Sequence, residues 1–320
     1  MTKSRIQYKK KKRRFRPFVV ILLTVLLLGL SYGGYLFFSA IKAANHSYTE
    51  LDRGDKSNLR DEEVTITKDP ISILITGVED YTDGGIGRTD SIMVATLNPD
   101  NQSMKLLSIP RDTLVEIPDR ANEDKINHAY AFGGKDLTIE TVENFLDIPI
   151  DYYASVNFEG FKKIVDEIGG VTVDVPFDFW EDSDGRPRQR IYFTEGEMKL
   201  NGEEALAYAR MRKQDKRGDF GRNERQQQII TAAIDSMVSP ATLLKLDDIA
   251  KHVGENVETN ISLTRGLSLQ RTYPNINSSK IEKLSITGED AYYDSIYYFV
   301  PDEEELLALQ QELKAHLKHN

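Results

Sequence analysis

Arginines gather in one short stretch of an otherwise acidic chain. Residues 208–228 read YARMRKQDKRGDFGRNERQQQ, and the arginines are Arg210, Arg212, Arg217, Arg222 and Arg225. Guanidinium groups bind phosphate through two parallel hydrogen bonds, which lysine cannot do. Because Arg222 is expected to open a helix over 223–238, the helix N-terminus adds a second feature that favours an anion. A solvated helix face is the alternative, but Arg222 and Arg225 are i, i+3 neighbours that repel each other unless an anion lies between them.

An acidic, glycine-rich loop offers a different chemistry. Residues 77–90, GVEDYTDGGIGRTD, follow the apolar run at 71–77 and carry four carboxylates. Closely spaced carboxylates suit a hard cation such as Mg²⁺, and glycines let the backbone approach a ligand closely. Such a loop is more often a solvated turn, so taken alone it is weak evidence for a metal site.

A third candidate is the sequence SIPRD at 108–112, at the end of a predicted strand. The proline ends the hydrogen bonding along that strand, so Arg111 projects from its edge. Its partner is either a bound phosphate or, in a structural ion pair, Asp112. The lone His128 is interpreted as structural, and the sequence contains no P-loop, GxSxG or HExxH motif.

The elements that must position these residues alternate between strands and helices. Apolar runs predict strands at 71–77, 91–98, 103–110 and 171–175, and the turn sequence at 98–101 joins the second and third into a hairpin. Apolar stripes and end signals predict helices at Lys135–Leu146, 159–168, 201–208 with Asn201 as N-cap, 223–238 and the C-terminal tail. The alternation predicts a layered α/β/α domain with a central mixed sheet.

The N-terminal end differs sharply from the rest of the chain. Residues 1–16 carry nine lysines or arginines and no acid, which leaves 32 basic and 51 acidic residues, a net −19, for everything after. Residues 17–40 are apolar and uncharged, and roughly 20 such residues cross the hydrocarbon core of a bilayer. We therefore predict a basic cytoplasmic tip (1–16), one transmembrane helix (17–40), a stalk (41–69) with order beginning at Ile71, and an extracytoplasmic domain (70–320). A cleavable signal peptide is the alternative, but its apolar core is shorter.

Composition excludes several other classes. The chain has no cysteine, so it has no disulfide scaffold, thiol nucleophile or cysteine-ligated metal. Its basic cluster lies outside the folded domain, whereas proteins that bind nucleic acid show basic surface on the domain itself. We therefore expect no nucleic-acid partner.

Five blocks in order resemble the LytR-CpsA-Psr family of cell-wall glycopolymer ligases. The resemblance covers most of residues 70–240, and the blocks are ILITGVEDYTDGG…GRTDS, LLSIPRDTLVEIP, DKINHAYAFGG, YYASVNFEGFKKIVDEIGGV and LNGEEALAYARMRK…DFGRNERQQQII. The resemblance implies a membrane-anchored phosphotransferase. Its donor is a glycopolymer, such as teichoic acid, on a polyprenyl-pyrophosphate carrier, and its acceptor is a hydroxyl group of peptidoglycan.

The resemblance also implies roles for individual residues. Arg111, Arg222 and Asp90 are implied as catalytic. Pyrophosphate is implied to be held by Arg88, Arg210, Arg212, Arg225 and Gln226. One Mg²⁺, for which Mn²⁺ can substitute, is implied at Asp90 and Glu79 or the adjacent Asp80. The lipid tail is implied to occupy an apolar pocket lined from 135–168 and 223–238.

Two other functions use the same residues. A polyprenyl-pyrophosphate phosphatase would take water as the acceptor. A non-enzymatic regulator that binds anionic wall polymers would need the arginines but not the carboxylates. Transfer of phosphoryl groups depends on positioning and charge neutralisation, which arginines and Mg²⁺ supply, so the transferase remains the leading hypothesis.

Overall fold

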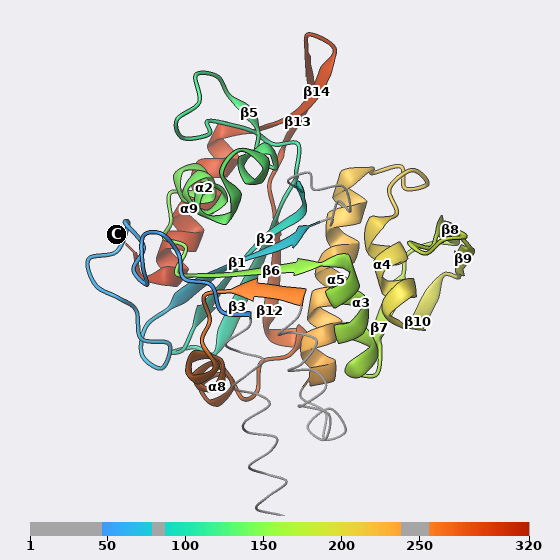
Figure 1. Cartoon of the computed structure of the whole chain (residues 1–320), viewed down its shortest axis with the longest axis horizontal. Coiled ribbons are helices and arrows are strands. Elements are labelled where there is room, and N and C mark those ends of the chain that lie inside the picture. Colours follow the sequence, from blue (N-terminus) through green and yellow to red (C-terminus); the bar gives the residue numbers. More distant parts are fainter. Residues whose placement is uncertain (1–46, 79–86, 238–255, 320) are drawn as a thin grey trace, which may run out of the picture.

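A six-stranded mixed sheet forms the centre of the molecule (Figure 1). The computed structural model describes residues 47–78, 87–237 and 256–319. The strand order is β11 (Val257–Thr259), β6 (Tyr152–Asn157), β1 (Ile71–Val78), β2 (Thr89–Asn98), β3 (Ser103–Ile109) and β12 (Ile281–Ser285). Neighbours β1–β6 and β3–β12 are parallel and the other pairs are antiparallel. The predicted mixed sheet and the predicted hairpin, now β2–β3, are confirmed.

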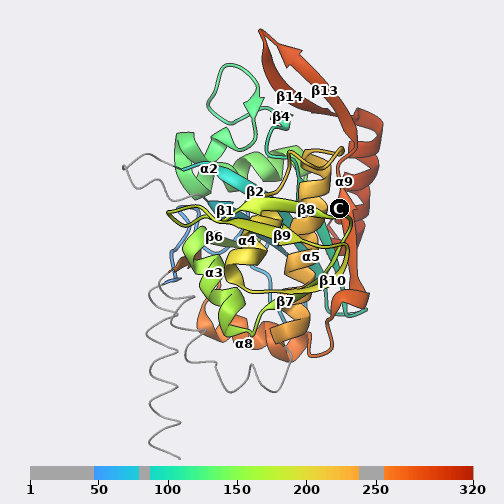
Figure 2. The same cartoon turned by 90° about the vertical axis from the view of Figure 1, so that its right-hand side faces the viewer.

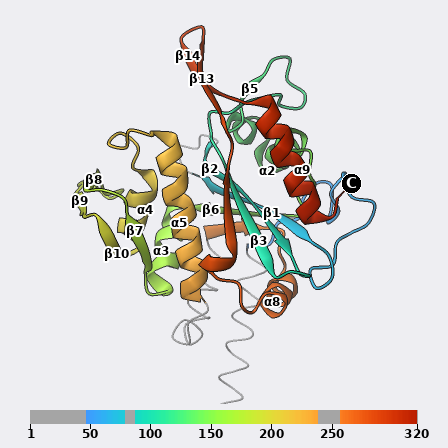
Figure 3. The ribbon, with the colours of Figure 1, turned by 180° about the vertical axis from the view of Figure 1, so that it is seen from behind.

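The two faces of the sheet are both covered because its strands are apolar on both sides. Leu74, Ile92 and Val94 pack with α2 (His128–Leu146) and α9 (Glu303–Leu317). On the opposite face, Met93 and Ala95 pack with α5 (Asp219–Met237) and α8 (Leu263–Thr272). This alternation follows the two-residue period of a strand and gives the predicted α/β/α layering, seen from both sides in Figures 1 and 3.

A second hydrophobic core lies on the side of α5 that faces away from the central sheet. It joins α3 (Phe158–Glu167) and α4 (Gly202–Arg210) to two small strand pairs, β7 (Val171–Val175) with β10 (Gly196–Leu200) and β8 (Phe179–Asp182) with β9 (Arg190–Phe193). The predicted cap of α4 is confirmed, because the Asn201 side chain accepts from the Glu204 backbone N–H at 3.0 Å and the Glu204 side chain accepts from the Asn201 backbone N–H at 2.9 Å.

Two helices begin earlier than predicted. Helix α2 starts at His128 because a kink at Gly133 and Gly134, both with non-helical backbone angles, joins an extra turn to the predicted helix. Helix α5 starts at Asp219, so Arg222 lies in its first turn instead of opening it. An acidic residue in that first turn favours the helix dipole.

The segment before the first strand packs on the domain. Leu51 and Ile66 are buried, and ion pairs join Arg53 to Glu143 at 2.7 Å and Arg60 to Asp151 at 2.8 Å. The expectation that order begins at Ile71 is therefore wrong, since these partners lie about ninety residues away and local composition did not reveal them. The expected membrane helix at 17–40 lies outside the described residues, and among the helices that the structure does describe none is long and apolar enough to span a bilayer.

A two-stranded hairpin projects from the body of the molecule. Strands β13 (Gly288–Tyr293) and β14 (Ile296–Pro301) extend beyond the layers in all three views (Figures 1, 2 and 3). Beside its base lie the short strands β4 (Leu114–Val115) and β5 (Asp124–Lys125), and a 3₁₀ turn at Ser278–Lys280 precedes β12.

Candidate active site

A cavity of about 440 Å³ lies between the sheet and helices α3, α4 and α5. Its apolar lining is Ile75, Met93, Val156, Phe158, Phe161, Leu206, Ala209, Ile229 and Ile230. Its volume falls within the usual range for ligand pockets, roughly 300–1,000 Å³. The predicted apolar pocket is present, and 158–168 and 223–238 contribute to it, whereas α2 does not.

Helix periodicity explains why α5 supplies both ends of the cavity. Arg222, Gln226, Ile229 and Ile230 follow the i, i+4, i+7, i+8 pattern of one helix face, and all four line the cavity. The arginine lies at the N-terminal end of this row and the isoleucines lie deeper. The cavity therefore has a charged mouth and an apolar interior.

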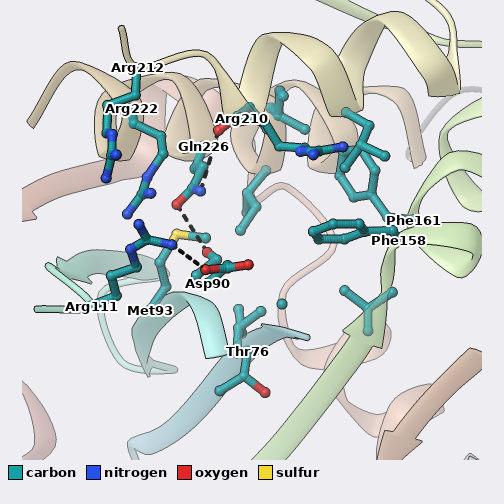
Figure 4. Close-up of a pocket in the computed structure, with 18 of the residues that line it drawn as sticks. Thr76, Asp90, Met93, Arg111, Phe158, Phe161, Arg210, Arg212, Arg222 and Gln226 are labelled. Carbon is teal, nitrogen blue, oxygen red and sulfur yellow. Dashed lines mark hydrogen bonds and ion pairs between the residues drawn. The ribbon is translucent and has the colours of Figure 1, made fainter. Parts of the chain in front are cut away.

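Arg111 and Asp90 meet at the mouth although they come from different strands. Arg111 follows β3, Asp90 is the second residue of β2, and the Arg111 guanidinium donates a hydrogen bond to the Asp90 carboxylate (Figure 4). Burial lowers the pKa of Arg111, but Asp90 and Asp112 outweigh it, so the pKa of Arg111 lies above its usual value. Arg111 is therefore fixed as a cation whose side chain is still about a quarter exposed (26%).

Arg222 lies beside Arg111 and is more deeply buried. Its side chain is 7% exposed, its Nη2 donates to Asp219 at 2.8 Å, and its Nε has no hydrogen-bond partner. Burial is the main cause that lowers the pKa of Arg222, Asp219 opposes it, and the nearby Arg111 and Arg212 lower it further. An anion bound between Arg111 and Arg222 would relieve this repulsion, so the pair is built for an anionic group.

Further polar residues surround this pair. Arg212 contacts Asp219 at 3.4 Å, and Gln226 accepts a hydrogen bond from the Ser91 hydroxyl at 3.0 Å. Arg210 pairs with Asp184 at 2.8 Å. Figure 4 shows Arg111, Arg212 and Arg222 grouped at one end and Arg210 beside the phenylalanines, where its guanidinium lies 5.2 Å from the Phe158 ring centre.

Arg225 does not join this group, so the expectation that Arg225 helps to hold the pyrophosphate is wrong. Arg225 is 1% exposed, donates to Asp215 at 2.6 Å and donates to the Met211 carbonyl oxygen. These contacts direct Arg225 toward the loop between α4 and α5, where Asp215 neutralises it.

The remaining predicted residues fall into two groups. Arg88 is exposed and does not line the cavity. Glu79 and Asp80 lie outside the described residues. In the described part of the chain no three His, Asp or Glu side chains cluster as a metal site. Asp90 nevertheless fits Mg²⁺, because that ion often takes only one or two carboxylates together with phosphate oxygens and water.

Several lining residues were not singled out from the sequence. Phe158 and Phe161 are i, i+3 neighbours on the first turn of α3, and Glu181 and Lys213 add charges at the rim. The phenylalanines looked like ordinary core residues, because a cavity and a core demand the same apolar side chains. The local signal for them is the strand-to-helix junction in NFEGF, where β6 ends at Asn157 and α3 begins at Phe158.

The arrangement suits an amphiphile with an anionic head. A long apolar tail fits between the sheet and the helices, and an anionic group fits at the mouth, where arginine forks can bind two oxygens each. Because the arginines are fixed by Asp90 and Asp219, little reorganisation is needed when negative charge develops nearby.

Known proteins share both the sequence and this architecture. The LytR_cpsA_psr family model matches residues 34–315. Over 313 residues the chain is 53% identical to the "polyisoprenyl-teichoic acid–peptidoglycan teichoic acid transferase TagV" of Bacillus subtilis (strain 168), covering 96% of this chain and 80% of that protein. The crystal structure of B. subtilis TagV superposes with a TM-score of 0.71 at 55% identity, covering 79% of this chain and 99% of that one. The family protein TagT with bound octaprenyl pyrophosphate lipid gives a TM-score of 0.67 at 32% identity, covering 85% and 100%.

Proposed function

Because the chain belongs to the LytR-CpsA-Psr family, we propose that it transfers teichoic acid, with one phosphate, from a polyprenyl-pyrophosphate carrier to a hydroxyl group of peptidoglycan. Relatives that carry this activity in their names support the reaction. A related structure with octaprenyl pyrophosphate bound supports the donor class.

The observation that carries the proposal is the meeting of Arg111 and Arg222 at the mouth of an apolar cavity. The two residues are 111 positions apart in the sequence and come from the end of β3 and the first turn of α5. Surface charges need not meet in this way. A site for a lipid-linked pyrophosphate requires both an apolar channel and convergent cations.

The roles of the residues follow from the charges of the reaction. The acceptor hydroxyl loses its proton to solvent as its oxygen forms a bond to the phosphorus that bears the polymer. The bond from that phosphorus to the bridging oxygen breaks, and polyprenyl phosphate leaves with the electron pair of that bond. The leaving phosphate gains negative charge, which Arg111 and Arg222 neutralise, while Arg212 stands at the rim. The cavity holds the prenyl chain, and Gln226, whose amide is held by Ser91 and by the Ala209 carbonyl oxygen, lines the cavity between Arg222 and the apolar interior.

We further propose that Mg²⁺ binds at Asp90, with Glu79 or Asp80 as a second ligand. Bound there, the ion would neutralise phosphate oxygens during transfer. The Asp90 carboxylate supports this role because it faces the mouth and is 28% exposed. Chelation should abolish transfer, and added Mg²⁺ or Mn²⁺ should restore it; activity that persists after thorough chelation contradicts the metal role.

The proposed location is the outer face of the cell membrane. The apolar run at 17–40 would anchor the chain once, with the basic tip inside and the catalytic domain outside. A relative is named as a transferase of teichoic acid to peptidoglycan, and such a transfer requires the enzyme to reach both substrates. A reporter fused after Asn320 should be active only outside the cell.

The decisive experiment is a transfer assay with the full chain, a synthetic lipid-linked donor and peptidoglycan oligomers. Covalent polymer–peptidoglycan product is expected. Release of polyprenyl phosphate that does not depend on the acceptor would instead identify a phosphatase. Polymer binding without turnover, unchanged by Asp90→Ala, would identify a binding protein.

A further inference from the structure

The projecting β13–β14 hairpin carries an exposed surface that has no role in the donor site described above. Its two-residue turn, Asp294 and Ser295, has positive φ angles of 50° and 68°, the geometry of a tight hairpin turn. Its base is anchored by Phe299, which is 1% exposed. An isolated two-stranded hairpin is only marginally stable, so side-chain pairs must support this one.

Aromatic side chains cover both faces of this hairpin. Tyr292 lies opposite Tyr297 with ring centres 5.6 Å apart, and Tyr293 lies 5.7 Å from Tyr298 on the other face. Tyr292 is 70% exposed, Tyr293 52% and Ile296 50%. We call the set of Tyr292, Tyr293, Ile296, Tyr297 and Tyr298 the tyrosine tip. Cross-strand pairs stabilise a hairpin, but that role does not require rings so largely exposed to solvent.

The base of the hairpin adjoins the segment that carries Arg111. The Phe299 backbone N–H donates to the carbonyl oxygen of Asp112, the residue after Arg111, at 2.9 Å. The Phe220 ring at the start of α5 meets the Phe299 ring edge-on at 5.5 Å. Lys125 joins Asp112 at 2.7 Å and lies 5.5 Å from the Tyr298 ring. The hairpin therefore extends directly from the backbone that holds Arg111.

Charge decides which substrate such a surface suits. Residues 288–301 contain Glu289, Asp290 and Asp294 and no lysine or arginine, which gives the hairpin a net charge of −3. A polyphosphate donor polymer and an anionic lipid surface would both be repelled. The faces of sugar rings are apolar and pack on aromatic rings, while tyrosine hydroxyls hydrogen-bond to the sugar hydroxyls. An uncharged sugar backbone therefore fits best.

We propose that the tyrosine tip binds the sugar backbone of the acceptor glycan strand and guides one of its hydroxyls to the mouth beside Arg111. This role rests on the proposed function, which identifies peptidoglycan as the acceptor. The apolar cavity would hold the donor from within, and the hairpin would hold the acceptor from outside. Donor and acceptor would thus meet from opposite sides of the arginines.

The test uses the full chain and the double variant Tyr292→Thr/Tyr293→Thr, since threonine keeps the β-propensity of the strand. The KM for peptidoglycan oligomers should rise about tenfold, a loss of about 1.4 kcal/mol. The KM for the donor should not change. The melting temperature should fall only slightly, because the two lost tyrosine pairs lie in the projecting hairpin and not in the cores of the domain. The matched control is Tyr192→Thr, because Tyr192 is 68% exposed on another two-stranded pair, β8–β9, and should show wild-type kinetics.

A binding assay separates this proposal from the proposed function. Binding of the full chain to peptidoglycan sacculi stripped of teichoic acid should weaken about tenfold in the double variant, whether or not transfer is observed. Tyr292→Phe/Tyr293→Phe keeps the rings and the hairpin, so it should retain most of the binding. Unchanged sacculus binding in the threonine variant overturns the proposal. So does a selective loss of binding to phosphatidylglycerol vesicles, which would identify a membrane contact, or a selective rise in donor KM.

Discussion

Arg222 and Arg225 lie three residues apart on one helix and are both buried, yet replacing each of them should impair a different property of the protein. Arg222 faces the cavity mouth beside Arg111, whereas Arg225 faces away and pairs with Asp215 at 2.6 Å. Replacing each with alanine separates a residue that binds substrate from a residue that holds the fold. We expect Arg225→Ala to lose stability and Arg222→Ala to lose transfer.

The cost of Arg225→Ala follows from the pair that it breaks. Removing one partner of a buried ion pair costs about 3–5 kcal/mol, because the other charge stays buried. Arg217 still contacts Asp215 at 3.4 Å, so the loss should lie near 3 kcal/mol, the lower end of that range. In a domain of this size about 1 kcal/mol moves the melting temperature by about 2–4 °C, so we expect a fall of about 6–12 °C.

Arg222→Ala should behave differently in the same assays. Burial and the neighbouring cations already lower the pKa of Arg222, and Asp219 keeps Arg212 as a partner at 3.4 Å. The melting temperature should therefore change by less than about 4 °C, or about 1 kcal/mol. Transfer should fall about 10²–10³-fold, as when one preorganised donor to a developing charge is lost.

Thermal unfolding by scanning fluorimetry and single-turnover transfer at saturating donor give the two readouts. The matched comparison is internal, since each variant serves as the control for the other. If Arg225→Ala melts with the wild type and loses transfer as Arg222→Ala does, the assignment of the two helix faces is wrong.

Three further outcomes are expected. Arg111→Lys should recover little of the transfer lost in Arg111→Ala, about 10²–10³-fold, because a point charge cannot replace a planar fork; melting curves should show both variants folded. Ala209→Phe should fill the cavity and raise the KM for a long-chain prenyl donor more than that for a short-chain donor, and equal changes would place the tail elsewhere. Burial, aided by Lys105, lowers the pKa of His316 below 6.5, so the unfolded chain takes up its proton first and stability should decline as the pH falls below about 6.5. His316→Gln should reduce that decline in urea titrations between pH 7.5 and 5, and an unchanged slope would assign it to other groups.

Local patterns were sufficient to predict the framework of the site. Apolar runs predicted β1, β2 and β3, and the turn at 98–101 predicted the hairpin between the last two. Arg111 was therefore placed correctly at a strand end, whereas Asp90, predicted as the last residue of a loop, is the second residue of β2. The meeting of Arg111 with Arg222 depends on packing between distant segments, and the family resemblance, rather than periodicity, predicted it.

Features that depend on tertiary contacts were predicted less well. Composition made Arg222 and Arg225 equally good candidates for binding phosphate. Their roles differ because the loop between α4 and α5 places Asp215 against Arg225. The tyrosine hairpin did carry a local signal, since DAYYDSIYYF contains two β-rich runs separated by Asp294 and Ser295. It was overlooked because no apolar alternation marks a hairpin that is largely exposed on both faces.

The packing of residues 47–69 against the domain limits the length of the linker between the proposed membrane anchor and the catalytic domain. If 17–40 spans the bilayer as proposed, only residues 41–46 separate the anchor from the segment that Arg53 and Arg60 clamp to Glu143 and Asp151. Six residues reach at most about 20 Å even when fully extended. The arginine-lined mouth would therefore work at a nearly constant height above the lipid, within reach of the prenyl chain, and would meet only the innermost layer of the wall.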